Sequence, residues 1–215
     1  MDSTFQPISY IPASQRDAIR DLKANSIWAV GHELLPQGGN HWCFYIQVGN
    51  GRSVSLDTVP SGWRGTVIPG GSKGNIIVGL QDFEAPTQAE RISKLDIDDA
   101  TSTVGCFLDV IVDAGRHHYE FTEAGSGCRQ WTTDQIDLFY KHGLVASYHQ
   151  VEQAKDDILT RWDNGRSLGE KYPLTAEIAP DRECDENVRN FEDKLHMHQK
   201  HVWQDRVKPP VTATA

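Results

Sequence analysis

Two alternating segments joined by Gly49-Asn50-Gly51 constrain the fold more than any other feature of the sequence. Residues 41–48 and 53–59 both alternate between apolar and polar side chains, which is typical of β-strands with one buried face. A connection made of glycine and asparagine is typical of a tight hairpin. The sequence therefore predicts an antiparallel hairpin over residues 41–59.

The register of this hairpin follows from its apolar faces. The even-numbered positions of the first strand are the apolar ones: Trp42, Phe44, Ile46 and Val48. A three-residue loop with Gly51 in the left-handed conformation aligns them with the apolar set of the second strand, whereas a two-residue turn aligns them with its polar set. We expect the three-residue loop. It puts Asp57 opposite Cys43 and diagonal to His41, within reach of a long side chain.

The other segments predict a mixture of strands and helices around the hairpin. Further strands are expected over residues 26–30, 75–80, 95–97 and 119–121. Helices are expected over residues 15–23, 103–114, 128–142, 147–162 and 186–203. Thr87-x-x-Glu90 resembles a capping box and predicts one more short helix. The pattern indicates an α+β fold, in which an antiparallel sheet packs against helices.

The length of 215 residues and a hydrophobic content of 38% suit one well-filled core with helical additions. We expect this core over residues 1–146. C-terminal helices over residues 147–205 are expected to pack on it or to form a homodimer, and residues 206–215 are expected to be a disordered tail.

The net charge of −9 argues against a nucleic-acid-binding surface, which needs clustered lysine and arginine side chains. The first 13 residues lack the apolar run of a secretory signal, and no stretch approaches the length of a membrane span. We therefore expect a cytoplasmic protein that binds neither nucleic acid nor membrane.

Metal and cofactor motifs are not evident in the sequence. The four cysteines stand at positions 43, 106, 128 and 184, and no pair has C-x-x-C spacing. His198 and His201 could share a helix face, but no His-Glu-x-x-His pattern supports a zinc site. We expect neither a metal nor a cofactor.

The segment around Cys128 carries the clearest chemical signal. This cysteine follows the turn Gly125-Ser126-Gly127 and opens a predicted helix. The unpaired N–H groups and the dipole at a helix start stabilise a thiolate, and the same N–H groups can hold an oxyanion. Glycines let a substrate approach the backbone. The alternative is a buried cysteine that follows an ordinary turn.

A nucleophilic thiol needs a base, and His41 is the candidate. It begins a strand after Gly38-Gly39-Asn40, so it is expected at an end of the sheet. Asp57, on the neighbouring strand, could orient the imidazole. Taken singly, His41 could be an exposed histidine at a strand edge, and Asp57 a solvated carboxylate.

A histidine on one strand, a polar residue on the next, and then a tyrosine–turn–cysteine–helix segment resemble the circularly permuted papain-like fold. Lecithin-retinol acyltransferase-like and desumoylating peptidase-like proteins share this order of histidine before cysteine. Asn40-His41-Trp42 and the segment from Gly125 to Trp131 also resemble an uncharacterised family of small fungal proteins. The resemblance covers about residues 26–145.

The resemblance implies a permuted papain-like core with Cys128 as nucleophile, His41 as base and Asp57 as the orienting residue. It implies an acyl hydrolase or acyltransferase that acts on a small-molecule or peptide-like substrate, in specialised metabolism as the fungal likeness suggests. The residues expected to line the substrate site are Trp42, Tyr45, Trp63, Ser126, Gly127, Arg129 and Trp131. Two alternatives remain open, namely a non-covalent cyclase, isomerase or lyase on the same scaffold, and an inactive binding protein.

Overall fold

The computed structural model describes residues 7–36, 38–61, 72–98, 100–122 and 125–174 of the chain. Those residues belong to one compact unit. The expectations for Trp63, for the helix over residues 186–203 and for the tail over residues 206–215 lie outside the described residues.

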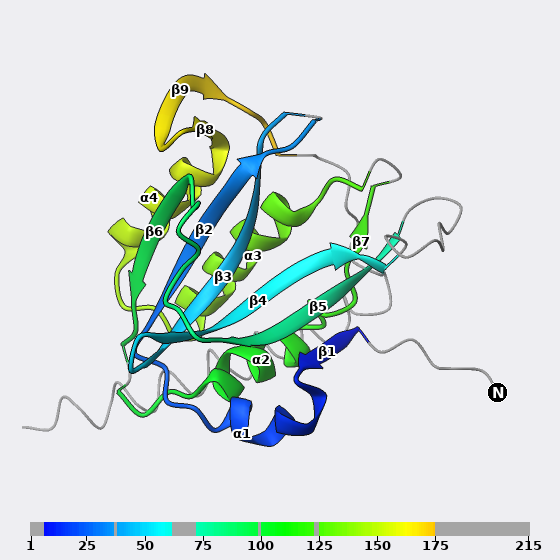
Figure 1. Cartoon of the computed structure of the whole chain (residues 1–215), viewed down its shortest axis with the longest axis vertical. Coiled ribbons are helices and arrows are strands. Elements are labelled where there is room, and N and C mark those ends of the chain that lie inside the picture. The colour runs from blue at the N-terminus through cyan, green and yellow to red at the C-terminus, as the bar shows by residue number, and fades with distance from the viewer. Residues whose placement is uncertain (1–6, 37, 62–71, 99, 123–124, 175–215) are drawn as a thin grey trace, which may run out of the picture. The chain divides into compact units, whose positions relative to one another are not determined.

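The main sheet has seven strands in the order β1-β5-β4-β3-β2-β6, and β7 pairs with the outer part of β5 (Figure 1). Its strands are β1 (Ile8–Ile11), β2 (Ser26–Leu34), β3 (Asn40–Gly49), β4 (Arg52–Pro60), β5 (Ser72–Gln81), β6 (Arg91–Asp96) and β7 (Glu120–Phe121). All neighbouring strands are antiparallel except β1, which runs parallel to β5. The chain therefore has the expected α+β fold, with one parallel edge strand that the sequence did not reveal.

The predicted hairpin forms in the expected register but through a different turn. Phe44 pairs with Leu56 and Ile46 with Val54, so the two apolar sets share a face. The turn has two residues, Asn50 and Gly51, both with positive φ. A bulge between Gln47 and Gly49 shifts the pairing by one residue and restores the alignment that we expected from a three-residue loop.

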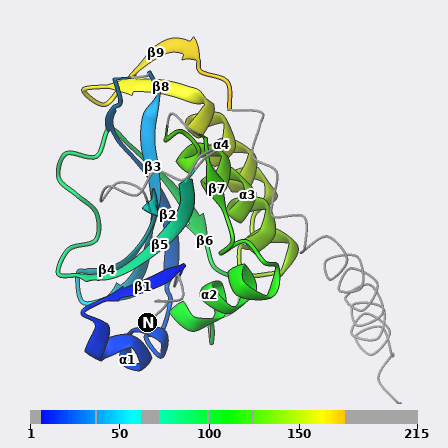
Figure 2. The same ribbon diagram turned by 90° about the vertical axis from the view of Figure 1, so that its right-hand side faces the viewer.

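Three helices cover one face of the sheet (Figure 2). They are α2 (Val104–Asp113), α3 (Cys128–Lys141) and α4 (Tyr148–Leu159), while the short α1 (Arg16–Arg20) contacts α2. The core between sheet and helices contains fully buried rings such as Trp42, Phe44, Phe107, Trp131 and Phe139. The indole of Trp42 packs directly on Gly31, where a Cβ would come within 2.9 Å of the ring. Among the described residues, no helix is both long and apolar enough to cross a membrane.

Helix α4 belongs to the same core as the preceding elements, because its Val151, Ala154 and Ile158 are buried against the other core residues. The expected helix over residues 147–162 ends earlier, at Leu159. The chain then forms a second, two-stranded sheet from β8 (Thr160–Asp163) and β9 (Arg166–Lys171). The predicted helix after Thr87 is wrong, since residues 82–90 contain only turns and bends.

Strands β3 and β4 separate as they leave their hairpin (Figure 1). Their pairing runs only from Gly49–Arg52 to Phe44–Leu56, whereas β4 continues to pair with β5 as far as Pro60. The diverging ends carry His41 on β3 and Asp57 on β4. This opening in the sheet is where α3 begins, because α3 contacts both strands.

Candidate active site

Cys128 is the first residue of α3, directly after the glycine turn that the sequence predicts. The turn is closed by two hydrogen bonds between Thr122 and Ser126: Thr122 N–H donates to the Ser126 carbonyl, and Ser126 N–H donates to Thr122 Oγ1. The Tyr119 hydroxyl donates to the Gly127 carbonyl at 2.9 Å. At the other side, Thr132 Oγ1 lies 2.8 Å from the Cys128 carbonyl and 3.3 Å from the Trp42 carbonyl. The thiol is therefore held against the start of β3.

His41 lies between Asp57 and Cys128. Its Nε2 lies 2.8 Å from Asp57 Oδ1, and the Cys128 thiol is close enough to the same imidazole for each group to shift the pKa of the other. Because Nε2 is engaged by Asp57, Nδ1 is the ring nitrogen that stays available. The structure thus brings together the three residues expected for catalysis, in the order carboxylate, imidazole, thiol.

The surroundings of Cys128 and His41 favour an ion pair between these two residues. Burial alone lowers the pKa of His41, but its interactions with Asp57 and Cys128 outweigh burial and hold that pKa well above its ordinary value. Burial raises the pKa of the Cys128 thiol, but the His41 hydrogen bond and charge, together with the Trp42 backbone N–H, bring it below its ordinary value. The arrangement therefore favours a thiolate beside an imidazolium.

The start of α3 also offers hydrogen-bond donors for an oxyanion. Trp131 N–H makes the first helical bond, to the Gly127 carbonyl, so the preceding N–H groups have no partner within the helix. The N-cap residue is Gly127, which has no side chain to satisfy them. N–H groups in this position can stabilise the negative oxygen that forms when a thiolate attacks a carbonyl.

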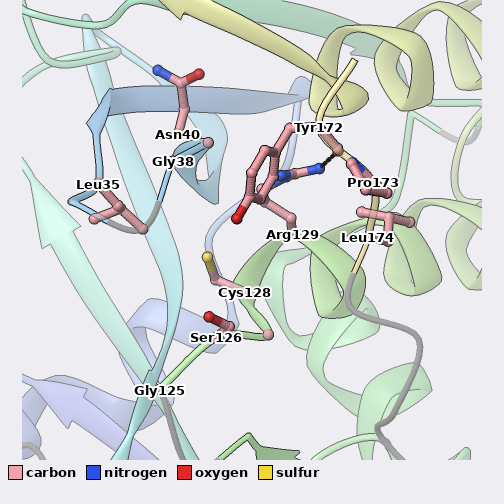
Figure 3. Close-up of a pocket in the computed structure, with 12 residues that line it drawn as sticks. Leu35, Gly38, Asn40, Gly125, Ser126, Cys128, Arg129, Tyr172, Pro173 and Leu174 are labelled. Atoms are coloured by element: carbon pink, nitrogen blue, oxygen red, sulfur yellow. Dashed lines mark hydrogen bonds between the residues drawn. The ribbon is translucent and has the colours of Figure 1, made fainter. Parts of the chain in front are cut away.

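A small pocket of about 50 Å³ opens at Cys128 (Figure 3). Its wall is formed by the segment that leads into β3, the glycine turn with the start of α3, and the residues that follow β9. The lining residues that matter for the chemistry are Gly39, Ser126, Gly127, Cys128, Arg129 and Tyr172. Cys128 is only 7% exposed, yet it forms part of the pocket wall and is not enclosed by hydrocarbon on all sides.

A second thiol, Cys43, lies two residues after His41 on β3 and packs with Val30 and Tyr45, outside the core that the helices cover. His32 Nε2 approaches its Sγ to 3.2 Å, and the His32 and His41 rings have centroids 5.6 Å apart. Ligand-type atoms of His41, Cys43 and Asp57 lie within 4.8 Å of one another, which is the one spacing among the described residues that would suit a metal ion. The hydrogen bonds between His41 and Asp57 and between His32 and Cys43 explain why these groups lie close together without a metal ion.

The expected substrate-binding residues divide into two sets. Ser126, Gly127 and Arg129 line the pocket beside the thiol. In contrast, Trp42 and Trp131 are each 1% exposed and belong to the core, and Tyr45 packs beside Cys43 on the other face of the sheet. These three aromatic side chains do not line the pocket, because Trp42 and Trp131 point into the core between the sheet and the helices and Tyr45 points to the other side of the sheet.

Three residues of the site were not foreseen as part of it. His32 was missed because the first strand was expected to end at Val30, whereas β2 continues to Leu34. Asn40 is buried and fastens β3 to β8, with its amide donating to the carbonyls of His32 and Trp162. Tyr172, whose ring lies over the Arg129 guanidinium, was missed because it follows the β8–β9 hairpin, and no strand was expected between residues 147 and 203.

The candidate site lies within a segment that matches a family model. Residues 27–178 match the model of a family described as Domain of unknown function (DUF7770). The match includes Cys128, His41, Asp57, Arg129 and Tyr172. No curated protein and no solved structure matches the chain. Since the family model spans well over half of the sequence, this chain is a member of the DUF7770 family.

Proposed function

We propose that this chain is a cysteine-dependent acyl hydrolase or acyltransferase of the cytoplasm, acting on a small-molecule or peptide-like substrate. The observation that carries the proposal is the hydrogen-bonded Asp57–His41 pair beside the Cys128 thiol, which stands at the start of a helix. The order of His41 before Cys128 on strand and helix also supports a relationship to the circularly permuted papain-like enzymes.

The first half of the reaction forms an acyl-enzyme. The Cys128 thiolate attacks the carbonyl carbon of an ester, thioester or amide, so that a C–S bond forms and the carbonyl electrons move to oxygen. The N–H groups at the start of α3 hold that oxygen. When the intermediate collapses, the bond to the leaving group breaks, and the leaving group takes a proton from the His41 imidazolium.

The second half releases the acyl group. Water or an amine attacks the thioester while neutral His41 accepts its proton, and Cys128 leaves as a thiolate. Asp57 keeps the imidazole oriented and stabilises its charged form in both halves. The site thereby returns to the thiolate–imidazolium pair from which it started.

The test is the trapping of the acyl-enzyme. The full chain is mixed with a panel of activated esters and thioesters, and the acylated peptide is identified by mass spectrometry. We expect one acyl group on Cys128, a burst of leaving group, and loss of both in Cys128→Ser. The variant Cys106→Ser, which alters a half-buried thiol on α2, serves as the matched control.

Turnover that survives in Cys128→Ser would contradict the proposal and would favour non-covalent chemistry on the same scaffold. The panel is repeated with a metal chelator because His41 and Asp57 have spacing that a metal ion could also use. Loss of acylation with the chelator would mean that the imidazole is not acting as a simple base.

A further inference from the structure

Arg129, the residue after the nucleophile, has a buried guanidinium whose hydrogen bonds go to uncharged groups. The residue is 8% exposed. Its Nε donates to the Ile158 carbonyl at 3.2 Å, and its Nη2 donates to the Tyr172 carbonyl. The Tyr172 ring lies over the guanidinium, 4.9 Å from ring centroid to Cζ. Within the described part of the chain, no carboxylate forms an ion pair with Arg129.

Arg91 shows what a complete environment for such a cation looks like in this protein. Its guanidinium also lies over an aromatic ring, Trp162, at 4.5 Å. In addition it pairs with the buried carboxylate of Asp157 at 2.9 Å. Arg129 has the ring, but among the described residues it has no such carboxylate. A buried cation without an anion is costly, since neutral carbonyls replace only part of its hydration.

Gly39, which lines the pocket, leaves room for the Arg129 guanidinium because it has no side chain. A Cβ on Gly39 would lie 2.7 Å from Arg129 Nη1 and 3.0 Å from the Tyr172 ring. Gly39 also has a φ of +86°, a conformation that favours glycine. Figure 3 shows Cys128, Arg129 and Tyr172 around the same pocket, with the Arg129 side chain beside the Tyr172 ring.

We infer that Arg129 binds a carboxylate of the substrate, so that the acyl donor is an ester, thioester or amide carrying a short carboxylate-bearing group. A guanidinium suits a carboxylate because its planar N–H groups match the two oxygens. The pocket volume of about 50 Å³ favours a small anion next to the attacked carbonyl. This inference rests on the proposed function, because it assumes that the substrate reaches Cys128.

Two alkylating reagents of nearly equal size test the inference without knowledge of the substrate. Iodoacetate is anionic and iodoacetamide is neutral, and both form a C–S bond at the thiolate with release of iodide. The rate constants for Cys128 are measured with each reagent, and their ratio is compared with the ratio for a small neutral thiol. We expect the protein to favour iodoacetate by about tenfold over that reference, which is about 1.4 kcal/mol.

The variants then assign the preference to Arg129. The ratio should fall to the reference value in Arg129→Gln and should be partly kept in Arg129→Lys. Arg161→Gln, which removes an arginine paired with Glu170, is the matched control and should keep the full preference. Succinate should protect Cys128 from iodoacetamide, whereas succinamide should not.

A wild-type ratio equal to the reference would overturn the inference, even if Arg129→Gln does not fold. It would mean that another group already neutralises the guanidinium. If both reagents alkylate Cys128 slowly but iodoacetate is still favoured over iodoacetamide, the thiolate mechanism is refuted and the inference that Arg129 binds an anion is kept. The two failures are therefore distinguishable.

Discussion

Cys128 and Cys43 are both buried thiols near His41 and Asp57, yet their pKa values are shifted in opposite directions. The pKa of Cys128 lies below its ordinary value. The pKa of Cys43 lies well above it, because the thiol is buried in the sheet and the Asp57 charge disfavours a second anion. Two thiols beside one imidazole–carboxylate pair thus differ in chemistry.

The difference lies in which positive groups face each sulfur. Cys128 faces the His41 imidazole, a backbone N–H of β3 and the start of α3. Cys43 faces His32, whose own pKa is lowered by burial and by the charge of His41, so this second imidazole is held neutral. The comparison teaches that burial does not decide thiol reactivity here, and that the direction of the surrounding charges and dipoles does.

The largest expected effect separates the two thiols directly. Cys128→Ser should abolish rapid labelling by iodoacetamide at neutral pH, because it removes the only described thiol with a lowered pKa. Cys43→Ser should leave the rapid phase in place. The labelled peptides are identified by mass spectrometry. Rapid labelling that is lost in Cys43→Ser and kept in Cys128→Ser would mean that Cys43, and not Cys128, is the reactive thiol.

The next effect makes Cys128 resemble Cys43. His41→Asn removes the imidazolium while burial remains, so the thiol should return to a high pKa. Only a few per cent of an ordinary thiol is ionised at neutral pH, so the alkylation rate should fall by about tenfold to a hundredfold. Stopped-flow alkylation measures the rate, and circular dichroism checks that the variant is folded. An unchanged rate would mean that the helix start alone stabilises the thiolate.

A smaller effect concerns the pH dependence of the same rate. The thiolate–imidazolium pair forms as pH rises through the lowered pKa of Cys128, and it persists until pH passes the raised pKa of His41. Asp57→Asn removes the carboxylate that stabilises the imidazolium, so the pKa of His41 should fall. The loss of that positive charge should raise the pKa of Cys128 by more than the loss of the weaker direct Asp57 repulsion lowers it. The acid-side midpoint of the alkylation profile should move up by about one pH unit. A shift toward lower pH would contradict the assigned role of Asp57.

The smallest expected effect concerns the backbone turn before Cys128, which has no counterpart at Cys43. Tyr119→Phe removes the hydroxyl that donates to the Gly127 carbonyl, so the turn before Cys128 loses one buried hydrogen bond. Urea unfolding should show a loss of about 1 kcal/mol, and alkylation of Cys128 should slow by less than tenfold. Tyr148→Phe is the control, since that side chain is 58% exposed. Equal losses of stability and alkylation rate in the two variants would mean that the Tyr119 hydrogen bond has no specific effect on Cys128.

Local patterns in the sequence were enough to predict the hairpin register and the proximity of His41, Asp57 and Cys128. The alternation around His41 and Asp57 fixed which side chains share a face, and the glycine turn placed Cys128 at a helix start. The pocket could not be predicted, because Tyr172 reaches it from a distant hairpin and no local pattern links that hairpin to Arg129. The aromatic residues failed as pocket residues for a similar reason, since amphipathic rings suit a core as well as a binding site.

The thiolate of Cys128 can be measured directly by its ultraviolet absorbance. A pH titration of the wild-type chain, with that of Cys128→Ser subtracted, isolates the ionisation of this one sulfur. The thiolate–imidazolium account predicts a midpoint below that of a free cysteine thiol, with the signal already present at neutral pH. A midpoint at or above that of a free thiol would contradict it, because Cys128 would then be a second inert buried thiol like Cys43.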